Sequence, residues 1–114
     1  MIPLTLQFNG RSVKTFGLLD SGATVSLFRP EIGRALKIPF NNQYGQVLKL
    51  AKGKLNAMIC EVGLRVGDVH FPAFIGFSRR HAASFNIIGR RGFFDHFGVY
   101  FNESKRRIGL AVKP

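Results

Sequence analysis

Short stretches in which apolar and polar residues alternate recur along this chain, and they constrain its fold more than any other feature. Residues 4–8 (LTLQF) and 57–66 (AMICEVGLRV) alternate or nearly alternate, as strands with one buried face do. Such segments follow one another at intervals of about 8–12 residues with glycine between them, which is typical of a β sandwich or barrel. The sequence therefore predicts a mainly β protein.

Turn-forming residues mark where these strands reverse direction. The Asn-Gly pair at 9–10 favours a two-residue hairpin turn because both residues accept positive φ angles, so it should join residues 4–8 to residues 12–18. Residues 52–53 (Lys-Gly) and 66–68 (Val-Gly-Asp) predict further hairpin turns.

Two stretches lack the strand pattern and are predicted to be short helices. Residues 30–36 begin with Pro30, which suits the first position of a helix, and carry Glu31 in the first turn. Residues 90–97 follow Gly89 without alternation. The expected fold class is all-β with one or two short helices.

The chain has the size and composition of one globular domain over residues 1–114. Hydrophobic residues make up 46% of it, including 12 phenylalanines, which excludes the composition of a disordered protein. No linker, repeat or low-complexity tract suggests a second domain. The lone Cys60 has no partner for a disulfide within the chain, so stability must come from packing or oligomerisation.

Location and charge limit the partners to be expected. No apolar run approaches the roughly 20 residues of a membrane span, and the first residues lack a signal-peptide pattern, so a soluble cytoplasmic protein without a membrane partner is expected. A net charge of +11 invites a nucleic-acid partner. The basic residues are scattered from Arg11 to Lys113 without a nucleic-acid-binding motif, which favours a solvated basic surface instead.

One acidic residue stands directly after an apolar strand and inside a turn of small residues, in the segment 18–24 (LLDSGAT). A charge placed there is costly to bury without a functional reason. Taken alone, the segment favours a simpler explanation, in which Asp20 accepts hydrogen bonds from turn amides.

A second segment changes that balance. Residues 86–90 (NIIGR) lie far downstream and lead through residues 91–94 (RGFF) into the predicted helix. The two segments, in this order and spacing, resemble those of the retropepsins, the single-domain aspartic proteases of the retroviral type. In that family Asp-Ser-Gly-Ala forms the active-site loop, and two apolar residues with Gly-Arg lead into the helix that supports it. The resemblance covers nearly the whole chain, from residue 4 to residue 112.

The resemblance implies a closed antiparallel β barrel of the acid-protease type, with one active site per homodimer and no metal or cofactor. Asp20 would be the catalytic acid and base, the Ser21 hydroxyl would form a hydrogen bond across the dimer, and Gly22 would lie along the substrate backbone. The other residues it assigns are Ala23 and Thr24 of the active-site loop, with Ala23, Phe85 and Ile87 lining substrate pockets and Ile88, Gly89 and Arg90 supporting the loop.

The hairpin 45–61 stands where a retropepsin has its mobile flap, and a glycine at its tip suits a hinge. The implied flap residues are Leu50, Ala51, Lys52, Gly53 and Lys54. Two features depart from the family. The tip has one glycine where retroviral flaps have more, and Thr24 stands where retroviral members usually carry an Asp that pairs with the Arg of the Gly-Arg motif. Arg90 therefore needs another partner.

The expected chemistry is attack by water on a peptide carbonyl, which takes two carboxylates. Of the chain's three aspartates, Asp68 and Asp95 lack the small-residue setting of Asp20, so a homodimer must supply the second one. The resemblance implies an endopeptidase that cuts extended proteins or peptides near apolar or aromatic residues, its own precursor among the candidates. The alternative is a non-catalytic binding module of the same fold, for an acidic partner or nucleic acid.

Other candidate sites are less favoured. Widely spaced histidines do not predict a metal site: His70, His81 and His96. Serines without a nucleophile motif do not predict a serine hydrolase: Ser21, Ser26 and Ser84. Cys60 is better explained as a packed core residue than as a reactive thiol.

Overall fold

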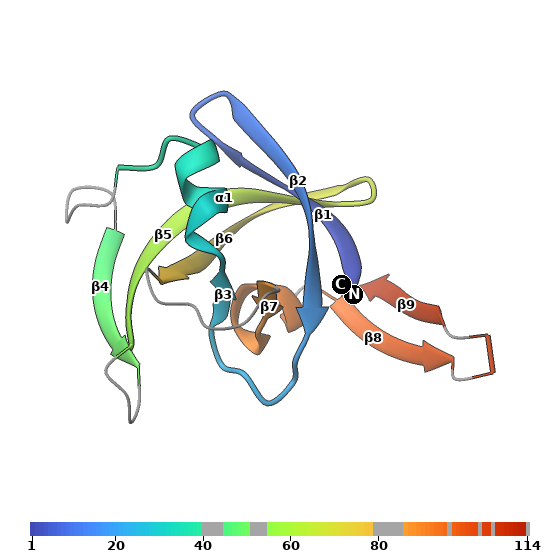
Figure 1. Ribbon diagram of the computed structural model, residues 1–114. Helices are drawn as coiled ribbons and strands as arrows, with labels where there is room; N and C mark the ends of the chain where they lie inside the picture. Colours follow the sequence, from blue (N-terminus) through green and yellow to red (C-terminus); the bar gives the residue numbers. More distant parts are fainter. Residues whose placement is uncertain are drawn as a thin grey trace.

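Strands make up most of the described chain (Figure 1). The computed structural model describes residues 1–39, 45–50, 55–78, 86–95, 97–102, 104–105 and 107–113. Its strands are β1 (Ile2–Phe8), β2 (Arg11–Leu19), β3 (Ser26–Phe28), β4 (Gly45–Leu50), β5 (Leu55–Val66), β6 (Val69–Ser78), β7 (Asn86–Ile88), β8 (Phe97–Asn102) and β9 (Arg107–Val112). The short helical segments are α1 (Pro30–Ala35) and η1 (Arg90–Phe94).

Six of these strands close into a barrel. Hydrogen-bonded neighbours follow the order β1-β2-β7-β3-β6-β5, and the pairing of Leu6 in β1 with Leu64 in β5 completes the ring. β4 pairs with the first half of β5 and extends the sheet beyond the ring. The predicted β barrel is confirmed, and it is mainly antiparallel, with parallel pairings between β2 and β7 and between β3 and β6.

Tight turns form where the sequence predicts them. Asn9 and Gly10 have φ angles of 51° and 82° between the paired strands β1 and β2, as a two-residue turn of this kind requires. Gly67, with φ of 59°, opens the turn between β5 and β6. The turn predicted at 52–53 lies outside the described residues.

The barrel interior is filled by alternate residues of the strands. In β1, Ile2, Leu4 and Leu6 are buried, whereas the residues between them are more exposed. This is the period of two that a strand with one buried face requires. A group of aromatic rings adds to the core, with centroids 5.0 to 6.4 Å apart among Phe71, Phe93 and Phe97.

One predicted helix is confirmed and the other is shorter than predicted. α1 begins at Pro30 and ends one residue before the expected end. The helix expected over 90–97 is reduced to η1, in which Arg91 is extended (ψ of 128°) and Gly92 has φ of 80°. Gly92 accepts this left-handed conformation, and Phe93 behind it is buried in the core.

Two hairpins lie outside the barrel ring. β4 and β5 pair from Gly45 with Cys60 to Leu50 with Leu55, which is the hairpin expected in the place of a flap. β8 and β9 form a separate two-stranded sheet that projects from the barrel near both chain ends (Figure 1). Over the described ranges, no helix has the length and apolar character needed to cross a membrane.

Candidate active site

Asp20 lies at the end of β2, where the chain leaves the barrel wall. β2 pairs with β7 in parallel through its last residues, Leu18 with Ile87 and Leu19 with Ile88. The Asp20 amide then donates a hydrogen bond of 2.9 Å to the Ile88 carbonyl. Two segments that are far apart in the sequence are thus joined at the acidic residue.

The residues after Asp20 form a turn that fixes its carboxylate. The Ala23 amide donates to the Asp20 carbonyl at 3.1 Å, and the Gly22 amide donates to Asp20 Oδ1 at 2.9 Å. Any Cβ on Gly22 would lie 3.2 Å from the same oxygen, so a larger residue would crowd the carboxylate. Asp20 is half-buried while Ser21 and Gly22 are exposed, so the carboxylate stands at an accessible edge.

The segment after β7 supports this turn from behind. The Arg90 amide donates to the Ala23 carbonyl, and the Arg91 amide to the Thr24 carbonyl, both at 2.9 Å. Gly89 is packed so closely that an added Cβ would lie 2.6 Å from the carbonyl carbon of Val25. Residues 88–90, which the resemblance assigns to the support of the loop, thus contact it through their backbone in this structure.

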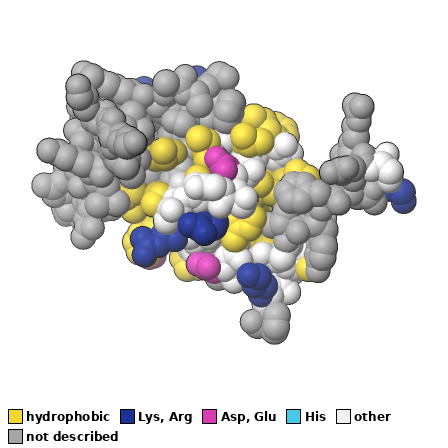
Figure 2. Space-filling model, turned by 90° about the horizontal axis from the view of Figure 1, so that it is seen from below, with side chains coloured by type: hydrophobic (Ala, Val, Ile, Leu, Met, Phe, Trp, Pro, Cys, Tyr) yellow, Lys and Arg dark blue, Asp and Glu magenta, His cyan; other side chains and the backbone are white. Residues whose placement is uncertain are grey.

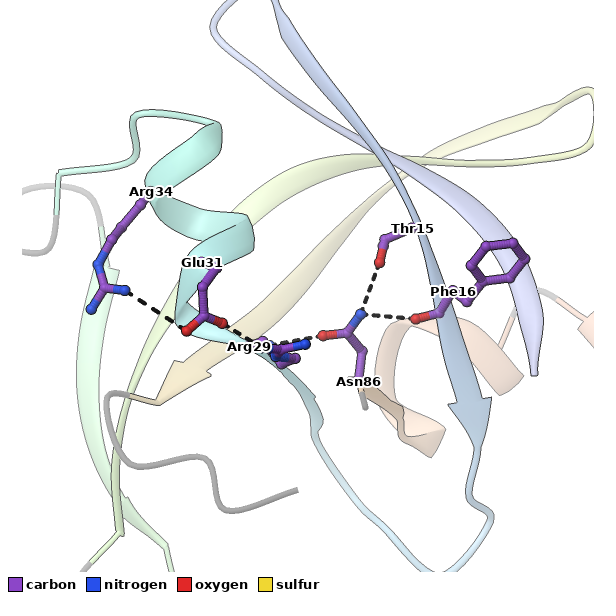
Figure 3. Close-up of polar contacts among 6 residues, drawn as sticks. All are labelled: Thr15, Phe16, Arg29, Glu31, Arg34 and Asn86. Atoms are coloured by element: carbon purple, nitrogen blue, oxygen red, sulfur yellow. Dashed lines mark hydrogen bonds and ion pairs between the residues drawn. The ribbon is translucent and has the colours of Figure 1, made fainter. Parts of the chain in front are cut away.

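Ser26 and Asn86 are buried polar residues that connect the same elements. The Ser26 hydroxyl accepts a hydrogen bond of 2.9 Å from the Gly89 amide. The Asn86 side chain donates to Thr15 Oγ1 at 3.1 Å and to the Phe16 carbonyl at 2.8 Å (Figure 3). It also accepts from the Arg29 amide at 2.8 Å, so it joins β7 to β2 and to the start of α1.

An apolar row runs across the barrel wall beside Asp20. Leu18 pairs with Ile87, Ile87 with Leu27, Leu27 with Gly76, and Gly76 with Ile59. Leu27 and Ile59 meet over Gly76, where a Cβ would lie 2.9 Å from Leu27 Cδ2 and 3.1 Å from Ile59 Cδ1. Apart from Gly76, which has no side chain, the residues of this row are at least partly exposed.

The row faces the side of the wall on which Asp20 emerges. Asp20 follows Leu18 by two residues, and side chains two residues apart in an extended chain point the same way. Figure 2 shows the molecule from this end, where hydrophobic side chains lie beside neutral groups and individual acidic and basic side chains. A carboxylate beside an apolar strip is an arrangement that suits a polar reaction on an apolar peptide segment.

Sequence reasoning missed part of this arrangement. Leu27 and Ile59 were not among the expected pocket residues, and Ser26 was considered only as a nucleophile. Asn86 was noticed only as the start of a motif. The signal for Leu27 and Ile59 lies in the pairing of β3 with β6 and of β6 with β5, which local alternation does not reveal.

The remaining expected site residues are Phe85, the flap residues 50–54, Thr24 and Arg90. Phe85 and the flap-tip residues Ala51, Lys52, Gly53 and Lys54 lie outside the described residues, whereas Leu50 ends β4. Thr24 is exposed, and the Arg90 side chain is exposed and forms no ion pair with a described carboxylate.

Within the described ranges, no group of three or more His, Cys, Asp or Glu residues could hold a metal ion. His70 lies in β6 and is exposed, while His81 and His96 are not described. Cys60 is buried in the core, where burial and the neighbouring Glu61 raise the pKa of its thiol above the ordinary value of 9.0.

Comparisons with known proteins agree on the fold. No protein-family profile matches the chain, and no curated protein matches it. EIAV protease, solved in complex with the inhibitor HBY-793, is 18% identical with a TM-score of 0.54, over 77% of this chain and 78% of that one. The retroviral protease-like domain of Ddi1 from Leishmania major is 16% identical with a TM-score of 0.60, and the match covers 100% of this chain and 94% of that one. A retropepsin-like aspartic protease from Rickettsia conorii is 14% identical with a TM-score of 0.60, and the match covers 87% of this chain and 74% of that one. The chain therefore has the retropepsin-like fold.

Proposed function

We propose that residues 1–114 act as one retropepsin-like domain and that two copies form an aspartic endopeptidase with Asp20 of each copy at the active site. The observation that supports this most is the loop of Asp20. Its carboxylate is fixed by the Gly22 amide, and its backbone is held by Ile88. An apolar row lies beside it. A carboxylate oriented in this way and still accessible fits a group that exchanges protons with water.

The proposed reaction needs two carboxylates with different tasks. One takes a proton from the attacking water, and the other, protonated, polarises the peptide carbonyl. Two carboxylates at short distance hold one proton between them, because a double negative charge there is unfavourable. Asp68 lies in the exposed turn after β5 and Asp95 is exposed beyond η1, so neither is a candidate partner. A two-fold axis would bring in a second Asp20.

The substrate in this proposal is an extended peptide whose side chains alternate between pockets and solvent. Ala23 and Ile87, with Phe85 as a further expectation, would line the pockets together with Leu18 and Leu27 of the apolar row. That lining favours apolar or aromatic residues near the cut. The hairpin of β4 and β5, with the flap residues 50–54, would cover the peptide, and Ser21 would form hydrogen bonds across the dimer. A precursor of this chain is one candidate substrate.

The test is cleavage of an unstructured protein from acid to neutral pH, by the wild type and by Asp20→Asn. The wild type should cleave, most strongly at acid pH, and a transition-state mimic of the pepstatin type should inhibit it. Asp20→Asn should abolish cleavage while leaving the fold intact, because it removes the acid at nearly constant volume. Asp68→Asn, at an exposed turn, is the matched control and should cleave normally. Cleavage retained in Asp20→Asn would refute the assignment, and no cleavage by the wild type would favour a binding module.

A further inference from the structure

The outer face of the β1–β2 hairpin departs from the composition of a solvated sheet face. Such a face normally carries polar side chains opposite a buried apolar face. The buried face is regular here, but the exposed positions of β2 include Phe16 and Leu18. Phe16 is 60% exposed and Leu18 38% exposed, and Met1 beside them is 56% exposed.

These apolar residues are neighbours and not scattered. Phe16 pairs with Pro3 across the two strands, and Ile2 pairs with Gly17, so Met1 precedes the strand at the level of Leu18. Single exposed apolar side chains are ordinary, whereas a contiguous group marks an interaction surface. We call the group formed by Met1, Phe16, Lys14 and Arg65 the Phe16 surface.

A cationic row lies next to Phe16 on the same face. Thr5 pairs with Lys14 on one side and with Arg65 on the other, so the three side chains stand in line across β2, β1 and β5. They line a hollow of about 400 Å³, which Phe16 also lines. The Arg65 side chain is held by a hydrogen bond of 3.0 Å from its Nε to the Gly67 carbonyl. None of the described residues that line this hollow is acidic.

A second hollow lies on the other side of Phe16 and has a different character. Its volume is about 260 Å³, and its lining combines apolar side chains (Met1, Phe16 and Ile32) with polar ones (Thr15, Arg29, Glu31 and Asn86). Its cation, Arg29, is paired with Glu31 at 3.2 Å, as Figure 3 shows. The two hollows therefore differ in charge: Lys14 and Arg65 line the first without an acidic residue among its described lining, whereas the cation of the second is paired and lies beside the apolar side chains of Met1, Phe16 and Ile32.

We propose that the Phe16 surface binds an extended peptide segment of another protein, with carboxylates at one end and an apolar side chain at the other. The carboxylates lie over Lys14 and Arg65, and the apolar side chain enters the hollow between Phe16 and Met1. Positions two residues apart in a strand are separated by about 7 Å, so Lys14 and Phe16 match alternate side chains of an extended ligand. This inference goes beyond the proposed proteolysis and does not require Asp20.

Two other occupants fit less well. A second copy of this chain would have to offer carboxylates to Lys14 and Arg65 at this face, and the chain has 6 acidic residues against 17 basic ones. A nucleic acid would satisfy the cationic row but would leave the hollow at Met1 and Ile32 without an apolar side chain to fill it.

The experiment measures binding of a fluorescein-labelled peptide by fluorescence anisotropy. The probe is a ten-residue synthetic peptide of glutamates and serines with two leucines near one end. Matched probes replace the leucines by serine or the glutamates by lysine, and a single-stranded DNA oligonucleotide of equal charge serves as the competing class. Asp20→Asn is used throughout, so that the probes cannot be cleaved, and its binding result is independent of catalysis.

Variants separate the two halves of the Phe16 surface. Phe16→Ser is compared with Phe74→Ser, because Phe74 is equally exposed at 60% and lines neither hollow. Lys14→Glu is compared with Arg11→Glu, which changes the net charge equally on the same strand outside both hollows. All four positions are exposed, and thermal unfolding verifies that each variant is folded.

The proposal expects Phe16→Ser and Lys14→Glu each to weaken binding of the acidic leucine peptide roughly tenfold, with each control within about twofold of the parent. The probes with serine in place of leucine, or with lysine in place of glutamate, should bind the unsubstituted Phe16 surface at least tenfold more weakly than the acidic leucine peptide does. Equal losses in Phe16→Ser and Phe74→Ser, or tighter binding of the oligonucleotide than of the peptide, would overturn it. A fall in self-association on Phe16→Ser, seen by sedimentation, would also overturn it in favour of a contact between copies.

Discussion

At the scale of single residues, two buried polar side chains near the candidate site, Asn86 and Ser26, form hydrogen bonds to segments far away in the sequence. Asn86 joins β7 to residues 71 and 57 positions away in the sequence, Thr15 and Arg29. The Ser26 hydroxyl accepts a hydrogen bond from the Gly89 amide, 63 positions away in the sequence. Each is buried and hydrogen-bonded, as buried polar groups must be to avoid a large desolvation cost.

Asn86→Ala should destabilise the fold without touching the acid. It leaves the Arg29 amide and the Phe16 carbonyl without their partner, and an unpaired buried group costs about 1–3 kcal/mol. We expect the free energy of unfolding, measured with urea, to fall by about 2 kcal/mol or more. Ser12→Ala, at an exposed position of β2, is the control and should change it by less than about 0.5 kcal/mol. A loss no larger than that of the control would show that these hydrogen bonds contribute little.

Cys60 provides a prediction about pH. Its folded pKa is raised, first by burial and then by Glu61, so the folded chain keeps the thiol proton to higher pH than the unfolded chain does. The contribution to stability is complete below pH 9.0, the ordinary pKa, and is lost as pH rises above it. Under reducing conditions, the free energy of unfolding should fall more steeply with pH above 9.0 in the wild type than in Cys60→Ala, by at most about 1.4 kcal/mol per pH unit. Parallel pH dependences of the two proteins would contradict this.

The limit of sequence reasoning at this scale is visible in the same residues. Asp20 can be proposed from the sequence because its setting is local: an apolar strand, a small-residue turn and a second motif in a recognisable order. The partners of Asn86 and Ser26 are set by which strands become neighbours in the barrel. A hydrogen bond that spans such a distance in sequence leaves no local pattern, so these contacts could not be predicted.

At the scale of elements, the local rules worked wherever one interaction dominated. The Asn-Gly turn at 9–10 and the proline start of α1 are confirmed because backbone conformation alone decides them. The helix predicted over 90–97 was wrong in extent because tertiary packing decides there. Phe93 and Phe97 both enter the aromatic cluster, and Gly92 supplies the left-handed conformation that allows it.

Gly89→Ala tests the junction between β7 and the Asp20 loop. An added Cβ would lie 2.6 Å from backbone atoms of Val25 and 3.0 Å from the Ala23 carbonyl oxygen, so the loop must move. Overpacking of this kind costs about 1–3 kcal/mol, and the displaced loop should also lower kcat of the proposed reaction. Gly63→Ala is the matched control, because its Cβ would meet Gln7 at an ordinary 3.5 Å and should be nearly neutral. Equal stabilities of the two variants would show that the junction is loose.

At the scale of the whole molecule, the chain presents a complete barrel with one Asp20, which is half of the catalytic pair proposed above. The β8–β9 sheet projects beside the chain ends and has no further strand paired to it in the described part of the chain (Figure 1). Unpaired sheet edges are places where another chain can add strands. This projecting sheet is the element of the fold that suits contact with a second copy.

Two copies joined head to tail by a flexible glycine-serine linker provide the last test, because they fix the stoichiometry of the proposed site. For the unlinked chain, activity per chain should fall on dilution, since two chains must associate before a pair of Asp20 carboxylates exists. In the linked protein the second association is intramolecular, so activity per chain should stay constant over the same dilution.

Asp20→Asn in either half of the linked protein should abolish cleavage, because one carboxylate cannot both accept the water proton and donate to the carbonyl. The same substitution at Asp68 in either half should leave it unchanged. Half of the activity remaining with one Asp20 would mean that each barrel works alone, and the dimeric mechanism would have to be abandoned.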